Sequence, residues 1–203
     1  KTMTTGEGGM VVVNNKKIAD RIKLMRLHGI SRFSYNRFNT KVAKWKYDVL
    51  LPGFKYNLTD IAASIGRVQL NRLNEFHDKR CKLAELYYNE LVDIKIGLPP
   101  IPDNNIKNHS WHLFIIQVNP LCRDAIIEDL FQNKIGTSVH YIPLHLHSYW
   151  KSKHKLKVKN FKNSQKIYKK SISLPLYTKL SIKECFKITK SLKRILKKYE
   201  KIV

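Results

Sequence analysis

The sequence has few acidic residues for its size. Fifteen aspartates and glutamates stand against 39 lysines and arginines, which gives a formal net charge of +24 and a pI near 10.0. Such a charge favours partners that carry negative charge, such as nucleic acid, an anionic membrane surface or a nucleotide diphosphate. The sequence contains no recognised RNA- or DNA-binding motif and no alternation of aromatic and basic residues. We therefore do not expect nucleic-acid binding, and an anionic small substrate fits the charge equally well.

Cysteine and long apolar runs are also scarce. The three cysteines, Cys81, Cys122 and Cys185, are widely separated and fit no metal-ligand spacing, so we expect reduced thiols of a cytoplasmic protein. No apolar run approaches the roughly 20 residues that span a bilayer, and no signal-peptide pattern is present. The hydrophobic content of 43% is ordinary for a globular protein, which argues against wholesale disorder.

The first segment combines a lysine with a turn rich in threonine and glycine. Residues 1–9 read KTMTTGEGG, and residues 10–13 read MVVV. Taken alone, this pattern predicts a loop with a reactive amine that leads into a short buried strand. Glycines permit close backbone approach, and threonine hydroxyls are suited to a phosphate. A lysine beside glycines is most often an ordinary solvated residue, so the segment alone does not establish catalysis.

A second segment, residues 52–66, reads PGFKYNLTDIAASIG. Asn57 or Thr59 is suited to cap a helix, and backbone amides at such a helix start favour an anion near Lys55 and Asn57. An equally good interpretation is that Lys55 is an ordinary exposed residue and that Asn57 serves only as the helix cap. The apolar face of the predicted helix is formed by Ile61, Ile65, Val68, Leu73 and Phe76.

A third segment, residues 140–147, reads HYIPLHLH. Its three histidines have no acidic or cysteine ligand nearby, so we expect no metal site. A histidine here is suited to donate a hydrogen bond to a hydroxyl or phosphate, or to help a proton move. For His140 and His147, a hydrogen bond to the protein backbone is about as good an interpretation as a contact with a ligand.

The remaining pattern predicts an α/β fold with alternating helices and strands. The prolines of residues 98–102 mark a boundary between a first domain, residues 1–97, and a second, residues 98–203. We predict a helix ending at Gly29, an irregular loop over 31–53, helices over 77–94, 123–133, 164–170 and 181–199, and extended segments over 109–118, 135–141 and 173–177. Ser181 and Glu184 form the pattern of a capping box.

These segments resemble, in order, the motifs of the DegT/DnrJ/EryC1/StrS family of sugar-nucleotide aminotransferases, which depend on pyridoxal phosphate (PLP). The matching motifs are K-x-M-T-T-G-E-G-G, G-F-K-Y-N-L-T-D-I-A-A-S-I-G, H-Y-I-P-L-H and S-L-P-L-Y-x-x-L-S. The resemblance implies the end of the large domain of a fold-type-I PLP-dependent aminotransferase, followed by its small C-terminal α/β domain.

The resemblance also implies roles for individual residues. Lys1 takes the position of the catalytic Schiff-base lysine, which also binds the cofactor. Lys55 or Asn57 takes the position that reaches across a homodimer to the neighbouring PLP phosphate, and His140, Tyr141 and His145 take positions facing the sugar. The implied reaction moves an amino group from L-glutamate to a nucleotide-linked 4-keto sugar, for surface polysaccharide synthesis.

In the family, other parts of the active site precede the cofactor lysine. They include the acidic partner of the pyridine nitrogen, an aromatic residue that stacks on the ring and most phosphate ligands. We therefore expect that this 203-residue chain alone does not transaminate. The alternative is a truncated, non-catalytic relative that acts as a basic binding or dimerisation module.

Overall fold

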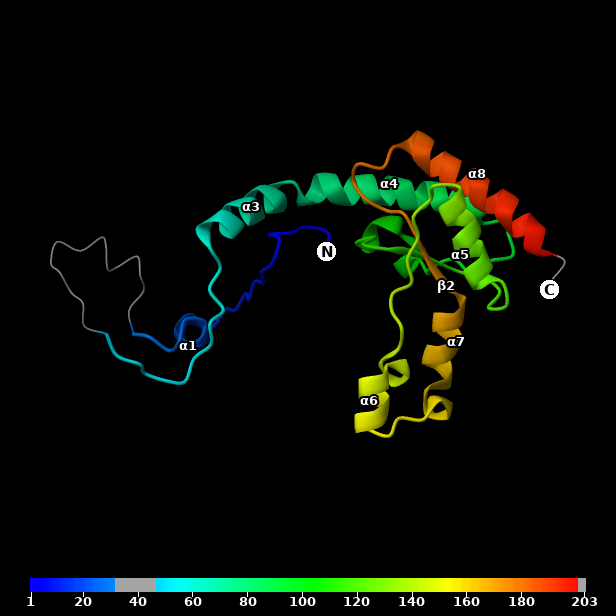
Figure 1. The fold of residues 1–203 in the computed structure, drawn as a ribbon. Coiled ribbons are helices and arrows are strands. Elements are labelled where there is room, and N and C mark those ends of the chain that lie inside the picture. Colours follow the sequence, from blue (N-terminus) through cyan, green and yellow to red (C-terminus); the bar gives the residue numbers. More distant parts are fainter. Residues whose placement is uncertain (32–46, 201–203) are drawn as a thin grey trace. The chain divides into compact units, whose positions relative to one another are not determined.

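The structure, a computed structural model, describes residues 1–31 and 47–200 (Figure 1). Most of the loop predicted over residues 31–53 therefore lies outside the described residues. The helices are α1 (Lys16–Met25), α3 (Asp60–Asn71), α4 (Leu73–Leu91), α5 (Arg123–Gln132), α6 (Ser148–Lys153), α7 (Lys162–Lys170) and α8 (Ile182–Tyr199). The strands are β1 (Phe114–Gln117) and β2 (Ser171–Leu174), and the 3-10 turns are η1 (Pro102–Asn104), η2 (Ile106–Asn108), η3 (Leu144–Leu146) and η4 (Val158–Phe161).

The chain divides into two compact units. The N-terminal unit is Met3–Asn71, and the core unit is Arg72–Val203 together with Lys1–Thr2. This division falls at the start of α4, not at the predicted boundary near residue 97, because α4 buries its apolar face within the core unit. The predicted boundary, as a division of the family fold into its large and small domains, stays a prediction.

The core unit is built around α4, α8 and a two-stranded antiparallel sheet (Figure 1). In the sheet, Phe114 pairs with Leu174 and Gln117 pairs with Ser171. All four residues of β2 are buried, as expected for a strand covered on both faces. The hydroxyl of Tyr87, on α4, donates to the carbonyl of Pro175 (2.7 Å), which ties the helix to the chain after β2.

Several predicted elements of the core unit are confirmed. Helices α5, α7 and α8 begin and end within about two residues of the predicted positions, and the capping box of Ser181 and Glu184 is present. The strand predicted over residues 109–118 is too long, because Trp111 adopts a positive φ of 45° and its indole donates to the carbonyl of Ile106 (2.6 Å). The strand predicted over residues 135–141 is reduced to one bridge between Ser138 and Ser173.

In the N-terminal unit, α1 ends at Met25 with Arg26 as its C-cap, before the end predicted at Gly29, and Gly29 lies in the turn that follows. Gly29 has a φ of +70° and its amide donates to the carbonyl of Leu24 (2.9 Å), which closes the end of α1. A Cβ at Gly29 would collide with the carbonyl oxygen of Leu51, so only glycine fits there.

Two predictions for the N-terminal unit are wrong. Residues 10–13 do not form a buried strand: Val12 is 85% exposed, because no strand in the described residues pairs with this segment. The helix predicted to continue to Phe76 ends at Asn71, since Arg72 has a non-helical backbone (φ −97°, ψ 4°). The predicted apolar face of α3 is exposed, with Ile61 at 76%.

We expect the capping box to stabilise α8 measurably. In Ser181→Ala, the amide of Glu184 loses its acceptor, and the free energy of unfolding should fall by about 1 kcal/mol. Urea denaturation followed by circular dichroism measures this change. Ser191→Ala, inside the same helix, is the matched control and should be neutral or slightly stabilising, because alanine is the better helix former. Equal losses in the two variants would contradict a specific capping effect.

Candidate active site

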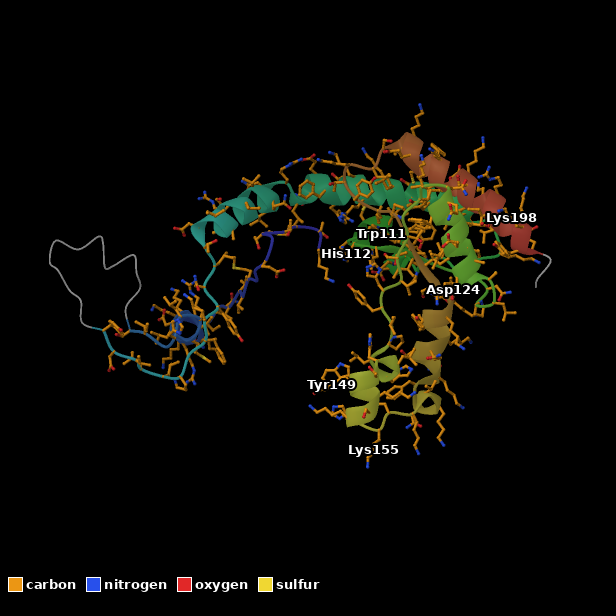
Figure 2. The ribbon with its side chains drawn as sticks, in the orientation of Figure 1. Trp111, His112, Asp124, Tyr149, Lys155 and Lys198 are labelled. Carbon is orange, nitrogen blue, oxygen red and sulfur yellow. The ribbon has the colours of Figure 1, made fainter. Side chains whose placement is uncertain are left out.

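His112 is the residue that the structure connects electrostatically with Lys1. It lies just before β1, next to Trp111 (Figure 2), and its ring nitrogen Nδ1 is buried without a hydrogen-bond partner among the described residues. Burial lowers the pKa of His112, and the positive charges of Lys1, Arg80 and His140 lower it further. His112 is therefore held as a neutral imidazole within electrostatic range of the Lys1 amine.

Arg80, on α4, holds the backbone that carries His112. Its Nη1 donates to the carbonyls of Trp111 (2.9 Å), His112 (3.2 Å) and Leu176 (3.1 Å). The side chain is buried, and burial lowers the pKa of its guanidinium. One buried cation therefore fixes the start of β1 and the chain after β2 to the same helix.

His140 and Tyr141 lie next to the sheet. The Nδ1 atom of His140 is 2.9 Å from the hydroxyl oxygen of Ser173 on β2 and 3.4 Å from that of Ser138. The ring of Tyr141 lies edge-on to that of His140, with 4.9 Å between centroids, and Tyr141 is 74% exposed. His140 is thus anchored to β2, whereas Tyr141 is open to a ligand.

The side chain of His145 is buried and contacts other residues of the protein. It is 3% exposed, its ring stacks on Phe161 at 4.6 Å, and its Nε2 is 3.2 Å from the amide oxygen of Gln165. These contacts give His145 a structural role, and the predicted contact with the sugar stays a prediction. His147 is paired with the carbonyl of Ile142 (3.1 Å), as the backbone interpretation expected.

Lys55 and Asn57 belong to the N-terminal unit, and both are exposed. Lys55 forms an isolated bridge with Leu27. The side chain of Thr59 accepts from the amide of Ala62 (3.2 Å), so Thr59, and not Asn57, caps α3. Asn57 is therefore not needed for the helix end. That either residue reaches a cofactor phosphate stays a prediction.

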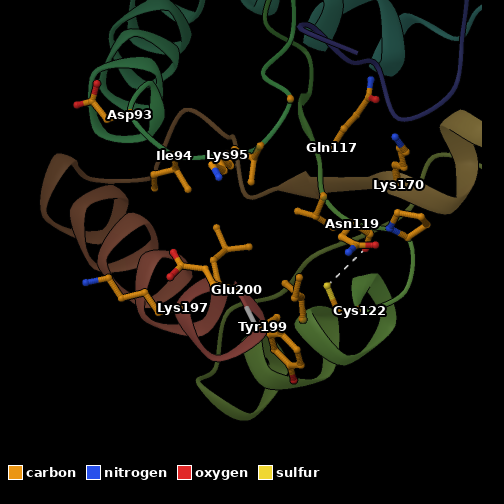
Figure 3. Close-up of a pocket in the computed structure, with 16 residues that line it drawn as sticks. Asp93, Ile94, Lys95, Gln117, Asn119, Cys122, Lys170, Lys197, Tyr199 and Glu200 are labelled. Carbon is orange, nitrogen blue, oxygen red and sulfur yellow. Dashed lines mark hydrogen bonds between the residues drawn. The ribbon is translucent and has the colours of Figure 1, made fainter. Parts of the chain in front are cut away.

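A cavity of about 1120 Å³ lies elsewhere in the core unit, between the chain after α4, the end of β1, α5 and α8 (Figure 3). It contains none of the predicted site residues, and lysines and carboxylates both line it, among them Lys95 and Glu200. Its Cys122 contacts the carbonyl of Asn119 (3.5 Å), and burial raises the pKa of the thiol. A protonated thiol is a poor nucleophile, so we do not assign the chemistry to this cavity.

The groups around Lys1 suit an anionic, electrophilic ligand. Every group that acts by its charge on the pKa of His112 is basic. The serine hydroxyls near His140 add hydrogen-bond capacity. In the described residues, no cluster of three or more histidines, cysteines and carboxylates could hold a metal ion. A lysine amine that contributes to the positive field at His112 is suited to an aldehyde that carries a phosphate, which is the chemistry of PLP.

A sequence profile of the DegT/DnrJ/EryC1/StrS aminotransferase family matches residues 1–193. The chain belongs to this family. Among curated proteins, it is 38% identical over 199 residues to an uncharacterized protein of Methanocaldococcus jannaschii, covering 96% of this chain and 51% of that protein. It is 34% identical over 202 residues to the spore coat polysaccharide biosynthesis protein SpsC of Bacillus subtilis, covering 97% and 51%.

Solved structures of the DegT/DnrJ/EryC1/StrS family agree with this assignment. A putative sugar aminotransferase of Streptococcus pneumoniae in its pyridoxamine phosphate form superposes with a TM-score of 0.84 at 28% identity, over 98% of this chain and 51% of that chain. The same protein is also known in a PLP form. The predicted family and fold class are confirmed, and PLP is confirmed as the cofactor of the family. The chain spans about half the length of the curated relatives it matches.

Sequence reasoning missed His112 and Arg80 as parts of this neighbourhood. His112 was assigned only to a predicted strand, and Arg80 to a predicted helix. They come together with Lys1 and His140 from segments 28 or more positions apart in the sequence. Periodicity reports on neighbours in one element and carries no information on such pairing. Arg80 and His112 lie outside all four motifs, so the sequence held no signal that could have found them.

We expect His112 to make folding sensitive to acid. In the unfolded chain its pKa lies near 6.5, above the lowered value in the fold, so on acidification the unfolded state takes up a proton first. The free energy of unfolding should therefore fall as the pH drops below about 6.5. Urea denaturation between about pH 7.5 and pH 5.5 should show a larger loss for the wild type than for His112→Gln. Equal losses in both proteins would contradict a lowered pKa.

We expect Arg80→Met to destabilise the core unit by about 3 kcal/mol or more, because three acceptor carbonyls lose their donor. The control is Arg72→Met, since Arg72 is exposed and pairs with Glu75 at the surface. Arg72→Met should lower the free energy of unfolding by no more than about 1 kcal/mol. Denaturation midpoints of the two variants measure the difference, and similar midpoints would rule out the buried clamp.

Proposed function

We propose that this chain supplies the cofactor-lysine half of a PLP-dependent aminotransferase. The enzyme moves an amino group from L-glutamate to a nucleotide-linked 4-keto sugar, in the cytoplasm, for the synthesis of a surface polysaccharide. The observation that carries the proposal is the family match, which starts at Lys1 and continues to residue 193. The polysaccharide assignment is supported by the name of the relative SpsC. The 4-keto position is supported by residues 53–57, GFKYN, which resemble the G-Y-K-Y-N of a family branch that acts on 4-keto sugar nucleotides.

The residues around Lys1 fit the cofactor. The amine of Lys1 is the group that would hold PLP covalently, and Lys1, Arg80 and His140 together produce a positive field at His112 that suits a phosphate-bearing molecule. When bound, PLP supplies the electron sink that lets a proton leave the carbon next to the amino group. Each group that acts by its charge on His112 is basic, and the acidic partner of the pyridine nitrogen is proposed to come from another segment or chain.

Each residue has a task that follows from its chemistry. A lysine amine loses its proton readily when desolvated, so Lys1 is suited to carry a proton at its Nζ between donor and acceptor carbon. His112 stays neutral, and this avoids a further positive charge that would repel the protonated amine. Tyr141 is exposed beside the anchored His140, and this exposure supports a role for its phenol hydroxyl in recognising a sugar hydroxyl.

A homodimer with shared active sites is part of the proposal. The N-terminal unit, which carries Lys55 and Asn57, has no buried residue in either α1 or α3. Its exposed large apolar residues include Met10, Val12, Ile18, Ile61, Ile65, Val68 and Leu70. Apolar surface on this scale normally meets a partner. A second copy covering it would bring the phosphate ligand of one subunit to the lysine of the other.

We expect covalent cofactor labelling at Lys1. The natural polypeptide that carries these residues is incubated with PLP and then borohydride, which makes the lysine–cofactor bond irreversible, and the adduct is located by peptide mapping. The Lys1 side chain should carry it. Lys1→Arg should lose it and should lower transfer from L-glutamate to a nucleotide-linked 4-keto sugar by about 1,000-fold or more. Lys17→Arg, a change of the same type on the exposed side of α1, should keep both.

A polypeptide that forms no adduct at Lys1 would contradict the proposal. Salt-sensitive binding of unrelated anions without cofactor uptake would then favour the non-catalytic basic module. Labelling without transfer would separate the two parts of the proposal. It would keep the cofactor site and reject the sugar substrate that was tested.

A further inference from the structure

Residues 148–170, the basic arm, carry an uncompensated positive charge. The arm contains nine lysines and neither aspartate nor glutamate, so 23 of 203 residues hold nine of the 39 lysines and arginines. The lysines are Lys151, Lys153, Lys155, Lys157, Lys159, Lys162, Lys166, Lys169 and Lys170. All but Lys170 are exposed. The ion pairs of the described residues involve other basic side chains, such as Lys193 with Glu90 and Lys198 with Asp129.

The helices and turns of the arm pack against one another, and most of its lysines point to solvent. Helix α6 packs against η3, α7 packs against η4, and the two turns contact each other. The buried ring of His145, stacked on Phe161, lies at this junction. Within the core unit, the arm extends away from α4 and α8, with Tyr149 and Lys155 near its far end (Figure 2). The structure therefore leaves most of the lysine side chains to solvent.

Apolar side chains are exposed among these lysines. Tyr149 is 60% exposed, Trp150 40% and Ile167 54%, and Val158 and Phe161 are also exposed. The ammonium of Lys153 lies 5.3 Å from the centre of the Tyr149 ring and 6.0 Å from that of Trp150. A fitting partner must therefore offer negative charge and apolar contact over the same area.

Two kinds of polyanion offer this combination, and the aliphatic residues favour one of them. Single-stranded nucleic acid is held by phosphate contacts and by stacking of bases on aromatic rings, to which Val158 and Ile167 contribute nothing. An anionic lipid surface attracts lysines to its head groups, accepts tryptophan and tyrosine at the interface, and buries aliphatic side chains beneath it. Every helix in the described residues is too short or too polar to cross a membrane. Binding would therefore be at the surface of the bilayer.

We propose that the basic arm docks this protein on an anionic phospholipid surface. The proposal goes beyond the aminotransferase function and does not depend on it. The lysines of the arm contact the phosphate and carboxylate groups of the lipids. Trp150 and Tyr149 lie at the level of the head groups, and Ile167 and Val158 add apolar contact.

The experiment is co-sedimentation of the natural polypeptide with vesicles at low and at physiological salt. The vesicles contain either phosphatidylcholine alone or phosphatidylcholine with phosphatidylglycerol. The arm variant carries Lys151, Lys155, Lys157 and Lys159 changed to Gln. The matched control carries Lys179, Lys183, Lys190 and Lys197 changed to Gln; all four are exposed, and three lie on α8. Both variants lose four charges, and circular dichroism checks that both are folded.

We expect the wild type to bind the phosphatidylglycerol vesicles and not the neutral ones. The arm variant should bind at least about tenfold more weakly, and the control should stay within about threefold of the wild type. Equal weakening in both variants, or no binding by the wild type, would overturn the proposal. A single-stranded oligonucleotide that releases the wild type from the vesicles, and binds it more tightly through the same lysines, would assign the arm to nucleic acid instead.

Discussion

The buried guanidinium of Arg80 connects three parts of the core unit that are distant in sequence. It comes from α4, and its Nη1 contacts backbone carbonyls before β1 and after β2. Burying a cation without a carboxylate is costly, and here three backbone carbonyls accept from Nη1, whereas Nε has no hydrogen-bond partner among the described residues. Because β1 and β2 pair with each other, this single group also fixes the sheet relative to α4. The positions of His112 and Ser173, and through Ser173 of His140, follow from it.

The scarce acidic residues are placed where they stabilise structure. Glu90 pairs with Lys193, Asp129 accepts from Lys198 and Tyr199, and Glu184 closes the cap of α8. Between Asp129 and Glu184 the sequence has no acidic residue at all. That interval contains His140, Tyr141, His145 and the basic arm. Because no acidic residue lies between Asp129 and Glu184, the positive charge of this interval is not compensated within it. An uncompensated positive charge favours anionic ligands of any size.

The parts of the fold that were predictable from sequence are those set by neighbours a few residues apart. The capping box at Ser181 depends on local chemistry and is confirmed, whereas α1 ends at Met25 and Gly29 serves the turn after it. The break between α3 and α4 at Arg72 could not be predicted, because no proline or glycine stands there. The strand before Gln117 is shortened by the bend at Trp111, whose indole donates to the carbonyl of Ile106 five residues earlier, a local contact that the alternating pattern does not predict. The grouping of His112 with Lys1 and His140 arises from tertiary packing, which no periodic pattern encodes.

The two units differ in how far the described residues account for their stability. The core unit buries a continuous apolar set that includes Tyr87, Phe114 and Leu192. The N-terminal unit has no buried residue on α1 or α3, and Ile61, Ile65 and Val68 are exposed along α3. A helix of 12 residues gains little from propensity alone and depends on packing of its apolar face. The described residues of this unit do not bury the apolar face of α3, so its order depends on a surface that covers Ile61, Ile65 and Val68.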